Sequence, residues 1–302
     1  MQELVTILIP THNRCEQLAN LLNRLLNQTY KNISIVISDN NSDDNTKEVC
    51  ENFQDQSIQF KYIKQNIDLG STGNFVYLYN TCETKYFMWL ADDDYIDDNY
   101  IEDCMKMHQK EEYALVSGQP VYYDSNGEKV FEGESFSILD HDNCKRTCNL
   151  LKLNRDNGIF YGVYNKTLVN SLSALTEPRS WGVDILFIAF VAYQGKIGSI
   201  ETACVHRSLD GVSATLENIV KSQSLNKINI FFPQLIMLYD VYSSYIKYIS
   251  NKKINAMRAA YAYLIGSEKN WFLWMIYHFF KMLLKNTSPK LFNLMRSSIK
   301  KV

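Results

Sequence analysis

The sequence lacks the cysteine patterns that hold zinc or build a disulfide-bonded scaffold. Its seven cysteines are scattered, their number is odd, and none forms a C-x-x-C pair. A zinc cluster or a secreted, disulfide-rich fold is therefore disfavoured, and a reducing cytoplasm fits the composition best. The N-terminus also lacks a basic segment, and its apolar run is too short for a signal peptide, so we expect no secretion signal there.

The common nucleotide-binding fingerprints are missing as well. No G-x-G-x-x-G follows the first apolar segment, which disfavours a dinucleotide enzyme, and the absence of G-x-x-x-x-G-K-[ST] excludes a P-loop. The short G-x-x-G at 70–73 carries little weight alone. If the protein binds phosphate, another group must hold it, and a divalent cation can do so.

Acidic residues are scarce in the last part of the chain. Residues 247–302 contain 11 lysines and arginines against one acid, Glu268, whereas the rest contains 20 basic and 32 acidic residues. The whole chain carries a formal net charge of -2, which gives no reason to expect nucleic acid as a partner.

This basic tail holds one aromatic, apolar segment at 271–284, WFLWMIYHFFKMLL. The segment is shorter than the roughly 20 residues that a helix needs to span a bilayer. Tryptophans flanked by lysines suit a helix on an anionic membrane surface, so peripheral membrane contact through 265–302 is one interpretation. A buried helix of a C-terminal subdomain, or a contact in a homo-oligomer, is the other.

The first hundred residues alternate between apolar runs and helical periodicity. Apolar runs predict strands at 4–10, 33–38, 58–64 and 86–91. Helices are expected between them and after the last one, starting after an N-cap at Asn13 and at 42–53, 74–82 and 97–110. This β-α order predicts a parallel, doubly wound sheet.

The pattern changes after residue 112. A hairpin turning at Asn126-Gly127 is expected within 113–130, followed by a helix, a strand, a helix and a strand at 140–153, 158–164, 184–193 and 196–206. From Glu217 onward the pattern is helical. We expect a boundary near 210–214 that divides a catalytic domain, 1–212, from a helical region, 213–302.

Polar side chains follow three of the predicted strands, at 10–14, 39–44 and 92–94. In an open parallel sheet, ligands bind beyond the carboxyl ends of the strands, so these sets should face one crevice. On an extended chain Asp92 and Asp94 point to the same face, with Asp93 opposite. Paired carboxylates of this kind suit Mg²⁺ or Mn²⁺. The alternative is a helix cap, which needs only one Asp.

Together these residues resemble a known family. The segments VTILIPTHNR, VISDNNSDD and LADDD, followed by WGVD at 181–184, resemble the inverting family 2 glycosyltransferases of the GT-A fold. The resemblance covers about residues 3–210 and is nearest to enzymes that build bacterial O-antigen, capsule or lipooligosaccharide chains. It implies an α/β fold with a Rossmann-like, mostly parallel central sheet between helices, here with a C-terminal helical extension.

The resemblance also implies roles for individual residues. Asp184 matches the general base, and Asp94, with Asp92 nearby, would ligate a Mn²⁺ or Mg²⁺ cofactor that bridges the donor diphosphate. His206 is a weaker match for a residue near the metal, and Trp181 could face the acceptor sugar. Contacts to the nucleotide-sugar donor are expected from Pro10, Thr11, His12, Arg14, Asp39, Asn41, Asn74, Asp92 and Asp93, with Asp39 reading the base, expected to be uracil.

Simpler interpretations stay open for four of these residues. Arg14 could merely pair with local acids, and His12 could be a packed or surface imidazole. Asp184 could be a helix N-cap, and Trp181 could be a core residue. Relatives also often carry Lys or Arg where this chain has Gly73, which puts phosphate contacts from that loop in doubt.

The predicted function is metal-dependent, inverting transfer of a hexosyl or N-acetylhexosaminyl unit. The donor would be a nucleotide-diphosphate sugar, expected to be a UDP-sugar, and the acceptor a hydroxyl of a growing cell-surface glycan, free or lipid-linked. The enzyme would act in the cytoplasm, at the inner face of the membrane. The rival functions are a sugar-nucleotide nucleotidyltransferase, whose glycine-rich loop is missing here, and a non-catalytic binding subunit of a membrane assembly.

Overall fold

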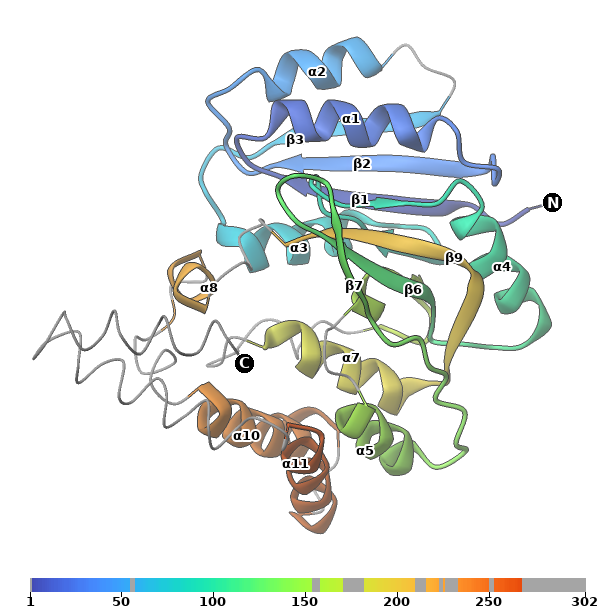
Figure 1. Ribbon diagram of the computed structural model, residues 1–302, viewed down its shortest axis with the longest axis vertical. Helices are drawn as coiled ribbons and strands as arrows, with labels where there is room; N and C mark the ends of the chain where they lie inside the picture. The colour runs from blue at the N-terminus through green and yellow to red at the C-terminus, as the bar shows by residue number, and fades with distance from the viewer. Residues whose placement is uncertain are drawn as a thin grey trace, which may run out of the picture.

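A computed structural model describes residues 2–54, 58–153, 158–170, 182–209, 216–222, 225, 233–249 and 253–267. Trp181, the expected boundary at 210–214 and the aromatic segment 271–284 lie outside these residues, so their interpretations stay predictions. The chain folds around one nine-stranded sheet of the order β3-β2-β1-β4-β8-β6-β9-β5, with β7 paired to β6. Figure 1 shows helices above and below this sheet.

The first half of the sheet is parallel, as the alternating pattern predicts. Its strands are β1 (Val5–Thr11), β2 (Ile33–Asp39), β3 (Gln59–Lys64) and β4 (Tyr86–Trp89). Strands β2 and β4 flank β1 in parallel, and β3 forms the edge beside β2. The central strand β1 is almost wholly buried, which explains its continuous apolar run.

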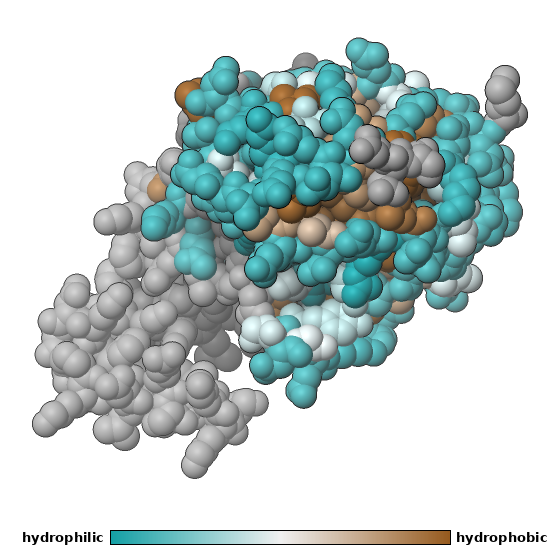
Figure 2. Space-filling view, turned by 90° about the horizontal axis from the view of Figure 1, so that it is seen from above, coloured by the Kyte–Doolittle hydropathy of each residue, from teal (hydrophilic) through white to brown (hydrophobic). Residues whose placement is uncertain are grey.

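Helices connect these parallel strands. They are α1 (Cys15–Leu25), α2 (Thr46–Phe53), α3 (Gly70–Thr81) and, after β4, α4 (Tyr100–Lys110). Helix α1 buries one leucine face, Leu18, Leu21, Leu22 and Leu25, against the sheet. Figure 2 looks onto the side of α1 and α2, and its mostly hydrophilic surface, crossed by one hydrophobic band, is consistent with that orientation.

The second half of the sheet is mixed. It contains β5 (Tyr95–Ile96), β6 (Leu115–Tyr123), β7 (Lys129–Glu132), β8 (Val163–Asn165) and β9 (Ile197–Ser208). Strand β8 joins the halves because it pairs antiparallel with both β4 and β6, while β6 and β9 are parallel. The α/β class with a central sheet is confirmed. The hairpin turn is also confirmed, with Gly127 at a φ of 76°.

Helices pack below this half of the sheet (Figure 1). They are α5 (Asn143–Leu153), α7 (Val183–Gln194), α10 (Pro233–Ser244) and α11 (Lys253–Ser267), with a π-helical turn at Tyr245–Ile249. The short α8 (Leu216–Ser222) lies at the left of Figure 1. Helix α5 packs against both α7 and α11. None of the described helices combines the length and apolar character that crossing a membrane requires.

Several predicted boundaries are wrong, each for a local reason. Asn13 adopts a left-handed conformation, with a φ of 53°, and is not the N-cap of α1. Instead the Asp44 carboxylate accepts from the Cys15 backbone N–H at 2.9 Å. Helix α3 starts at Gly70, so the predicted loop at 70–73 is its first turn. Residues 158–161 form the 3-10 helix η1 (Gly158–Tyr161) rather than the start of a strand.

Candidate active site

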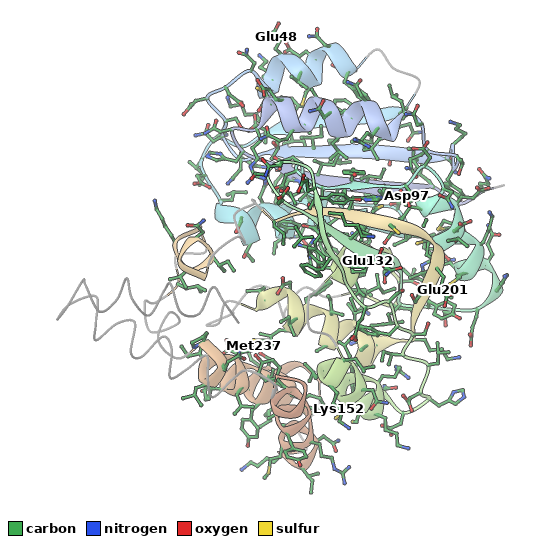
Figure 3. All side chains as sticks on the ribbon, viewed as in Figure 1. Glu48, Asp97, Glu132, Lys152, Glu201 and Met237 are labelled. Atoms are coloured by element: carbon green, nitrogen blue, oxygen red, sulfur yellow. The ribbon has the colours of Figure 1, made fainter. Side chains whose placement is uncertain are left out.

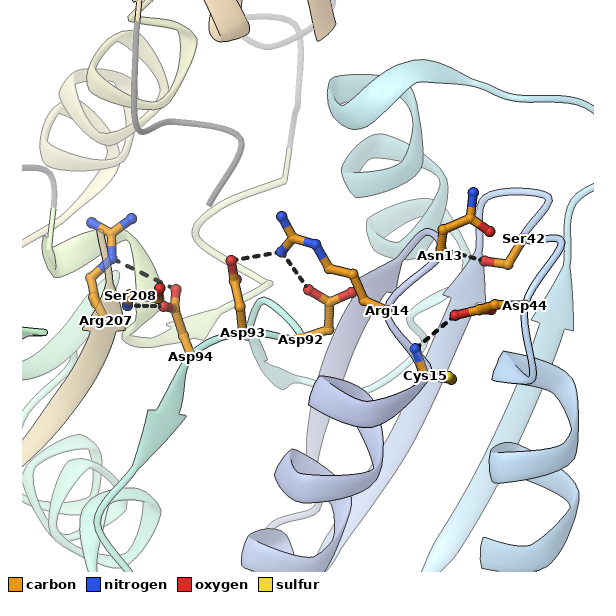
Figure 4. Close-up of polar contacts among 10 residues, drawn as sticks. All are labelled: Asn13, Arg14, Cys15, Ser42, Asp44, Asp92, Asp93, Asp94, Arg207 and Ser208. Carbon is orange, nitrogen blue, oxygen red and sulfur yellow. Dashed lines mark hydrogen bonds and ion pairs between the residues drawn. The ribbon is translucent and has the colours of Figure 1, made fainter. Parts of the chain in front are cut away.

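The first two polar segments meet where β1 and β2 end. The Asn13 backbone N–H donates to Ser42 Oγ at 2.8 Å, as Figure 4 shows, and the Asp43 backbone N–H donates back to Asn13 Oδ1 at 2.8 Å. His12 Nδ1 donates to the Asn40 carbonyl oxygen at 2.8 Å. The two segments therefore share one edge of the sheet, as neighbouring parallel strands require.

Arg14 joins the third segment to this edge. Its Nη1 donates to Asp92 Oδ1 at 3.0 Å and to Asp93 Oδ2 at 2.6 Å (Figure 4). Asp93 therefore shares a partner with Asp92, and the prediction that it points to the opposite face is wrong. The chain is not extended here, because the Asp94 backbone N–H closes a turn on the Ala91 carbonyl oxygen at 3.2 Å. The structure thus has the pairing of Arg14 with local acids that was one of its two interpretations, while a contact with the diphosphate stays a prediction.

Asp94 lies beside a second arginine, Arg207. Its Oδ1 accepts from the Ser208 backbone N–H at 2.8 Å, and its Oδ2 lies 3.7 Å from Arg207 Nε. The Arg207 guanidinium lies over the Tyr161 ring, 4.8 Å from its centre. The sequence did not single out Arg207 or Tyr161 as site residues. The only available signal in the sequence was an arginine directly after the predicted strand at 196–206.

Burial dominates the electrostatics of this cluster. It raises the pKa of Asp92 to about 6, against the opposing effect of Arg14, and the pKa of Asp94 to about 7, against that of Arg207. The two arginines therefore offset only part of the cost of burying these carboxylates. A further cation would lower both pKa values, so the oxygen donors present fit Mg²⁺ or Mn²⁺.

The described residues do not complete a metal site by themselves. Among the residues that the structure describes, no three His, Cys, Asp or Glu side chains group around a possible ion. With the described residues alone, a cation at Asp92 and Asp94 would take its remaining ligands from diphosphate oxygens and water, which is common for Mg²⁺.

His206 is not placed as a metal ligand, contrary to the expectation. Its Nε2 lies 2.7 Å from Asp97 Oδ1, and its Nδ1 lies 3.0 Å from the Tyr123 hydroxyl. Its ring stacks on Tyr95 at 4.3 Å between ring centres. Asp97, labelled in Figure 3, follows β5 directly. Because both ring nitrogens have protein partners, His206 ties β9 to β5 instead.

Asp39 ends β2 and is completely buried. Its Oδ1 accepts from the Ser42 backbone N–H at 2.8 Å, and its Oδ2 accepts from the Tyr62 hydroxyl at 2.6 Å. Thr11 of β1 is its partner in register. These contacts place the predicted base-reading carboxylate at the same edge as Asp92, but inside the protein.

Three further predicted donor contacts surround Asp39. Pro10 pairs in register with Ser38, and Asn41 adopts a left-handed conformation with a φ of 64°. Asn74 is buried, and its Nδ2 donates to the Ser38 carbonyl oxygen at 2.8 Å. Its Oδ1 has no hydrogen-bond partner in the part of the chain that the structure describes, which is unusual for a buried amide.

Asp184 lies in the first turn of α7. The N-cap residue is Gly182, so the alternative that Asp184 caps the helix is wrong. Its Oδ1 accepts from the Ile185 backbone N–H at 2.8 Å. A Cβ on Gly182 would lie 2.9 Å from Met237 Sδ, so α10 packs closely against the residues before Asp184 (Figure 3 labels Met237).

The buried phenol of Tyr161 is influenced by both Asp184 and the aspartate cluster. Burial is the main cause that raises the pKa of Tyr161, and Asp94 and Asp184 both add to it. Both carboxylates therefore act electrostatically on the same side chain. Asp94 and Asp184 therefore lie within electrostatic reach of the same phenol.

Solved structures share this fold. Residues 1–349 of S. aureus TarS, in complex with UDP-GlcNAc, align with a TM-score of 0.56 and 14% identity over 92% of this chain and 89% of that one. The mannosyltransferase PcManGT from Pyrobaculum calidifontis, in complex with GDP-Man and Mn²⁺, aligns with a TM-score of 0.57 and 9% identity over 98% of this chain and 79% of that one. At these identities the likeness concerns the fold alone.

Curated relatives are bacterial glycosyltransferases. The GalNAc(5)-diNAcBac-PP-undecaprenol beta-1,3-glucosyltransferase of Campylobacter jejuni is 28% identical over 169 residues, 55% of this chain and 53% of that protein. Glycosyltransferase GlyG of Streptococcus pneumoniae is 28% identical over 141 residues, 46% of this chain and 47% of that protein. The chain thus spans about half the length of each relative.

The sequence model of the glycosyl transferase family 2 matches residues 6–169. That match contains the three polar segments that meet at Arg14 and covers more than half of the chain. With its motifs, its site and its fold in agreement, this chain belongs to glycosyl transferase family 2.

Proposed function

We propose that this enzyme transfers a sugar, with inversion at the anomeric carbon, from a nucleotide-diphosphate donor to a hydroxyl of a growing cell-surface glycan. The observation that carries the proposal is the contact of Arg14 with Asp92 and Asp93, beside the Asp39 loop. It supports the proposal because it gathers the groups proposed to contact the base, the diphosphate and the metal at one sheet edge, where ligands bind in open α/β sheets. A hexosyl or N-acetylhexosaminyl unit from a UDP-sugar is the proposed donor group, as UDP-GlcNAc in TarS illustrates.

The acceptor alcohol must lose a proton as it attacks the anomeric carbon. Asp184 is the proposed general base, since it stands at the start of α7 near the aspartate cluster. The diphosphate leaves with its negative charge, and Arg14 and Arg207 are the side chains placed to offset charge in this region. A Mn²⁺ or Mg²⁺ held by Asp94 and Asp92 would supply Lewis-acid stabilisation of the leaving group.

The acceptor and the location of the enzyme are part of the proposal. The Campylobacter relative is named for an acceptor linked to undecaprenol through a diphosphate. A lipid-linked glycan would bring this enzyme to the cytoplasmic face of the membrane, where the basic residues of 265–302 could hold it peripherally. All seven cysteines are free, as a reducing compartment requires. Self-association through the same segment is the competing arrangement.

A panel of nucleotide sugars tests the function. The enzyme is incubated with each donor, with and without Mn²⁺, and release of the nucleoside diphosphate is measured. We expect metal-dependent turnover of one donor, and Asp184→Asn should bind that donor normally while transfer falls by about 10³-fold or more. Normal turnover by that variant contradicts the assignment of the base. In a parallel reaction with a nucleoside triphosphate and a sugar 1-phosphate, release of inorganic diphosphate would favour the nucleotidyltransferase. Binding of a nucleotide sugar without turnover would favour the non-catalytic subunit.

A further inference from the structure

The edge strand β3 supports the loop that follows β2. The Tyr62 hydroxyl donates to Asp39 Oδ2 at 2.6 Å, and the Gln65 backbone N–H donates to the Asp39 carbonyl oxygen at 2.8 Å. Gln65 Nε2 also donates to Ser38 Oγ, and Lys64 Nζ to the Ser42 carbonyl oxygen, at 2.8 and 2.6 Å. One end of β3 therefore fixes both the backbone and the side chain of the proposed base-reading residue.

Neutral donors alone hold the Asp39 carboxylate. Within the described residues it forms no ion pair, and its two oxygens accept from the Ser42 N–H and the Tyr62 hydroxyl. A carboxylate offers about four acceptor positions, so each oxygen can accept one more hydrogen bond. A buried carboxylate in this state favours a ligand that brings an N–H donor and disfavours one that brings a lone pair.

Tyr62 fixes which acceptor positions remain. Its short bond occupies one oxygen and restrains rotation of the carboxylate about its side-chain torsion, which is otherwise broad for Asp. The phenol is the donor in this contact. Its side chain is part-buried, at the free edge of the sheet, and takes no other role in the mechanism above.

We infer that Tyr62 is a positioning residue that aims Asp39 at the ring N–H of uracil and so gives the donor site its preference for UDP over CDP. Uracil carries a hydrogen on N3, whereas N3 of cytosine is a lone pair that would face the carboxylate. The two nucleotides are otherwise alike in size and in their diphosphate. The inference rests on the proposed function, because it assumes that a nucleotide occupies this edge.

Isothermal titration with UDP and with CDP, each in the presence of Mn²⁺, tests the inference. Wild-type protein should bind UDP at least about tenfold more tightly than CDP, the value of one hydrogen bond to a charged group. Tyr62→Phe should weaken UDP binding about tenfold and leave CDP binding unchanged, so that the preference is lost. The matched control is Tyr30→Phe, which removes a 2.7 Å phenol bond to the Glu3 carbonyl oxygen and should change neither affinity.

Each contrary outcome has a distinct meaning. An unchanged UDP-to-CDP ratio in Tyr62→Phe, or a wild-type preference for CDP, overturns the inference and leaves glycosyl transfer standing. Binding of neither nucleotide overturns the inference and the proposed donor together. If Tyr62→Phe fails to fold, Asp39→Asn replaces it, because an amide can donate to N3 of cytosine. That variant should favour CDP, and an unchanged preference for UDP contradicts the inference.

Discussion

The proposed donor site has two ends, and both depend on buried aspartates that are held in different ways. At one end Asp39 is held by neutral donors, the Ser42 N–H and the Tyr62 hydroxyl. At the other end Asp92 and Asp94 face the guanidinium groups of Arg14 and Arg207. The same residue type therefore suits different ligands at the two ends. At the first end it suits a ligand with an N–H donor, and at the second end a cation or a phosphate group.

At the second end, the arginines do not fully neutralise the charge of the aspartates. Three aspartates at 92–94 face two arginines, and burial still raises the pKa of both Asp92 and Asp94. An excess of buried negative charge costs stability unless a ligand offsets it. Neutralising a carboxylate should therefore have different effects at the two ends. At the first end it would remove a group that recognises the ligand. At the second end it would remove a source of repulsion and so favour the folded state.

The largest expected effect comes from Asp94→Asn. The amide keeps the shape of the side chain but is a poorer ligand for a hard cation, so transfer should fall by about 10³-fold. The thermal midpoint should stay equal or rise, because a buried charge is removed. Rates of nucleoside diphosphate release and calorimetry measure both. Asp103→Asn, which changes a carboxylate bound to Lys106 and Thr202 outside the site, should leave the rate unaltered. A wild-type rate in Asp94→Asn would rule out this carboxylate as a metal ligand.

The next effect concerns Arg14. Arg14→Met removes the shared partner of Asp92 and Asp93 and should destabilise the fold by about 2–3 kcal/mol near pH 8, above the pKa of Asp92. Lys47→Met, which breaks an exposed pair with Glu51, should change stability by less than about 0.5 kcal/mol. Urea unfolding gives both values. Equal losses in the two variants would mean that Arg14 behaves as an ordinary surface charge.

The sequence could predict the strands at both ends because burial on two faces demands continuous apolar runs. It could also predict that residues 10–14, 39–44 and 92–94 would meet, because the carboxyl ends of parallel strands share an edge. The family was accessible in the same way, since its motifs within residues 6–169 are local in sequence. The role of Asp184 stays a prediction. The alternation of strand and helix patterns in the sequence predicts the order of the elements and the edge of the sheet at which polar side chains lie.

The sequence could not predict the partners, because these depend on register and on distant pairing. Tyr62 reaches Asp39 only because β3 pairs with β2 so that Ile37 lies opposite Tyr62. Arg207 meets Asp94 because β9 pairs antiparallel with β5, a two-residue strand with no readable signal. The turn at Asp92–Asp93 replaced the expected extended chain, and so Asp93 joined Asp92 on Arg14.

The smallest expected effect is a pH dependence confined to the arginine-held end. Asp92 and Asp94 have pKa values of about 6 and about 7 in the folded protein, above their ordinary value of 3.8. An acid with a raised folded pKa binds more protons in the folded state, so its contribution to stability falls as the pH rises from about 4 to about 7. In the presence of EDTA, Asp94→Asn should therefore gain about 1–2 kcal/mol of stability relative to wild type between pH 5 and pH 8. Saturating Mn²⁺ with UDP should shrink that gain, because ligand binding to the ionised carboxylate stabilises only the wild-type fold. A pH-independent difference between the two proteins would show that Asp94 stays ionised throughout, with Arg207 sufficient to hold its charge.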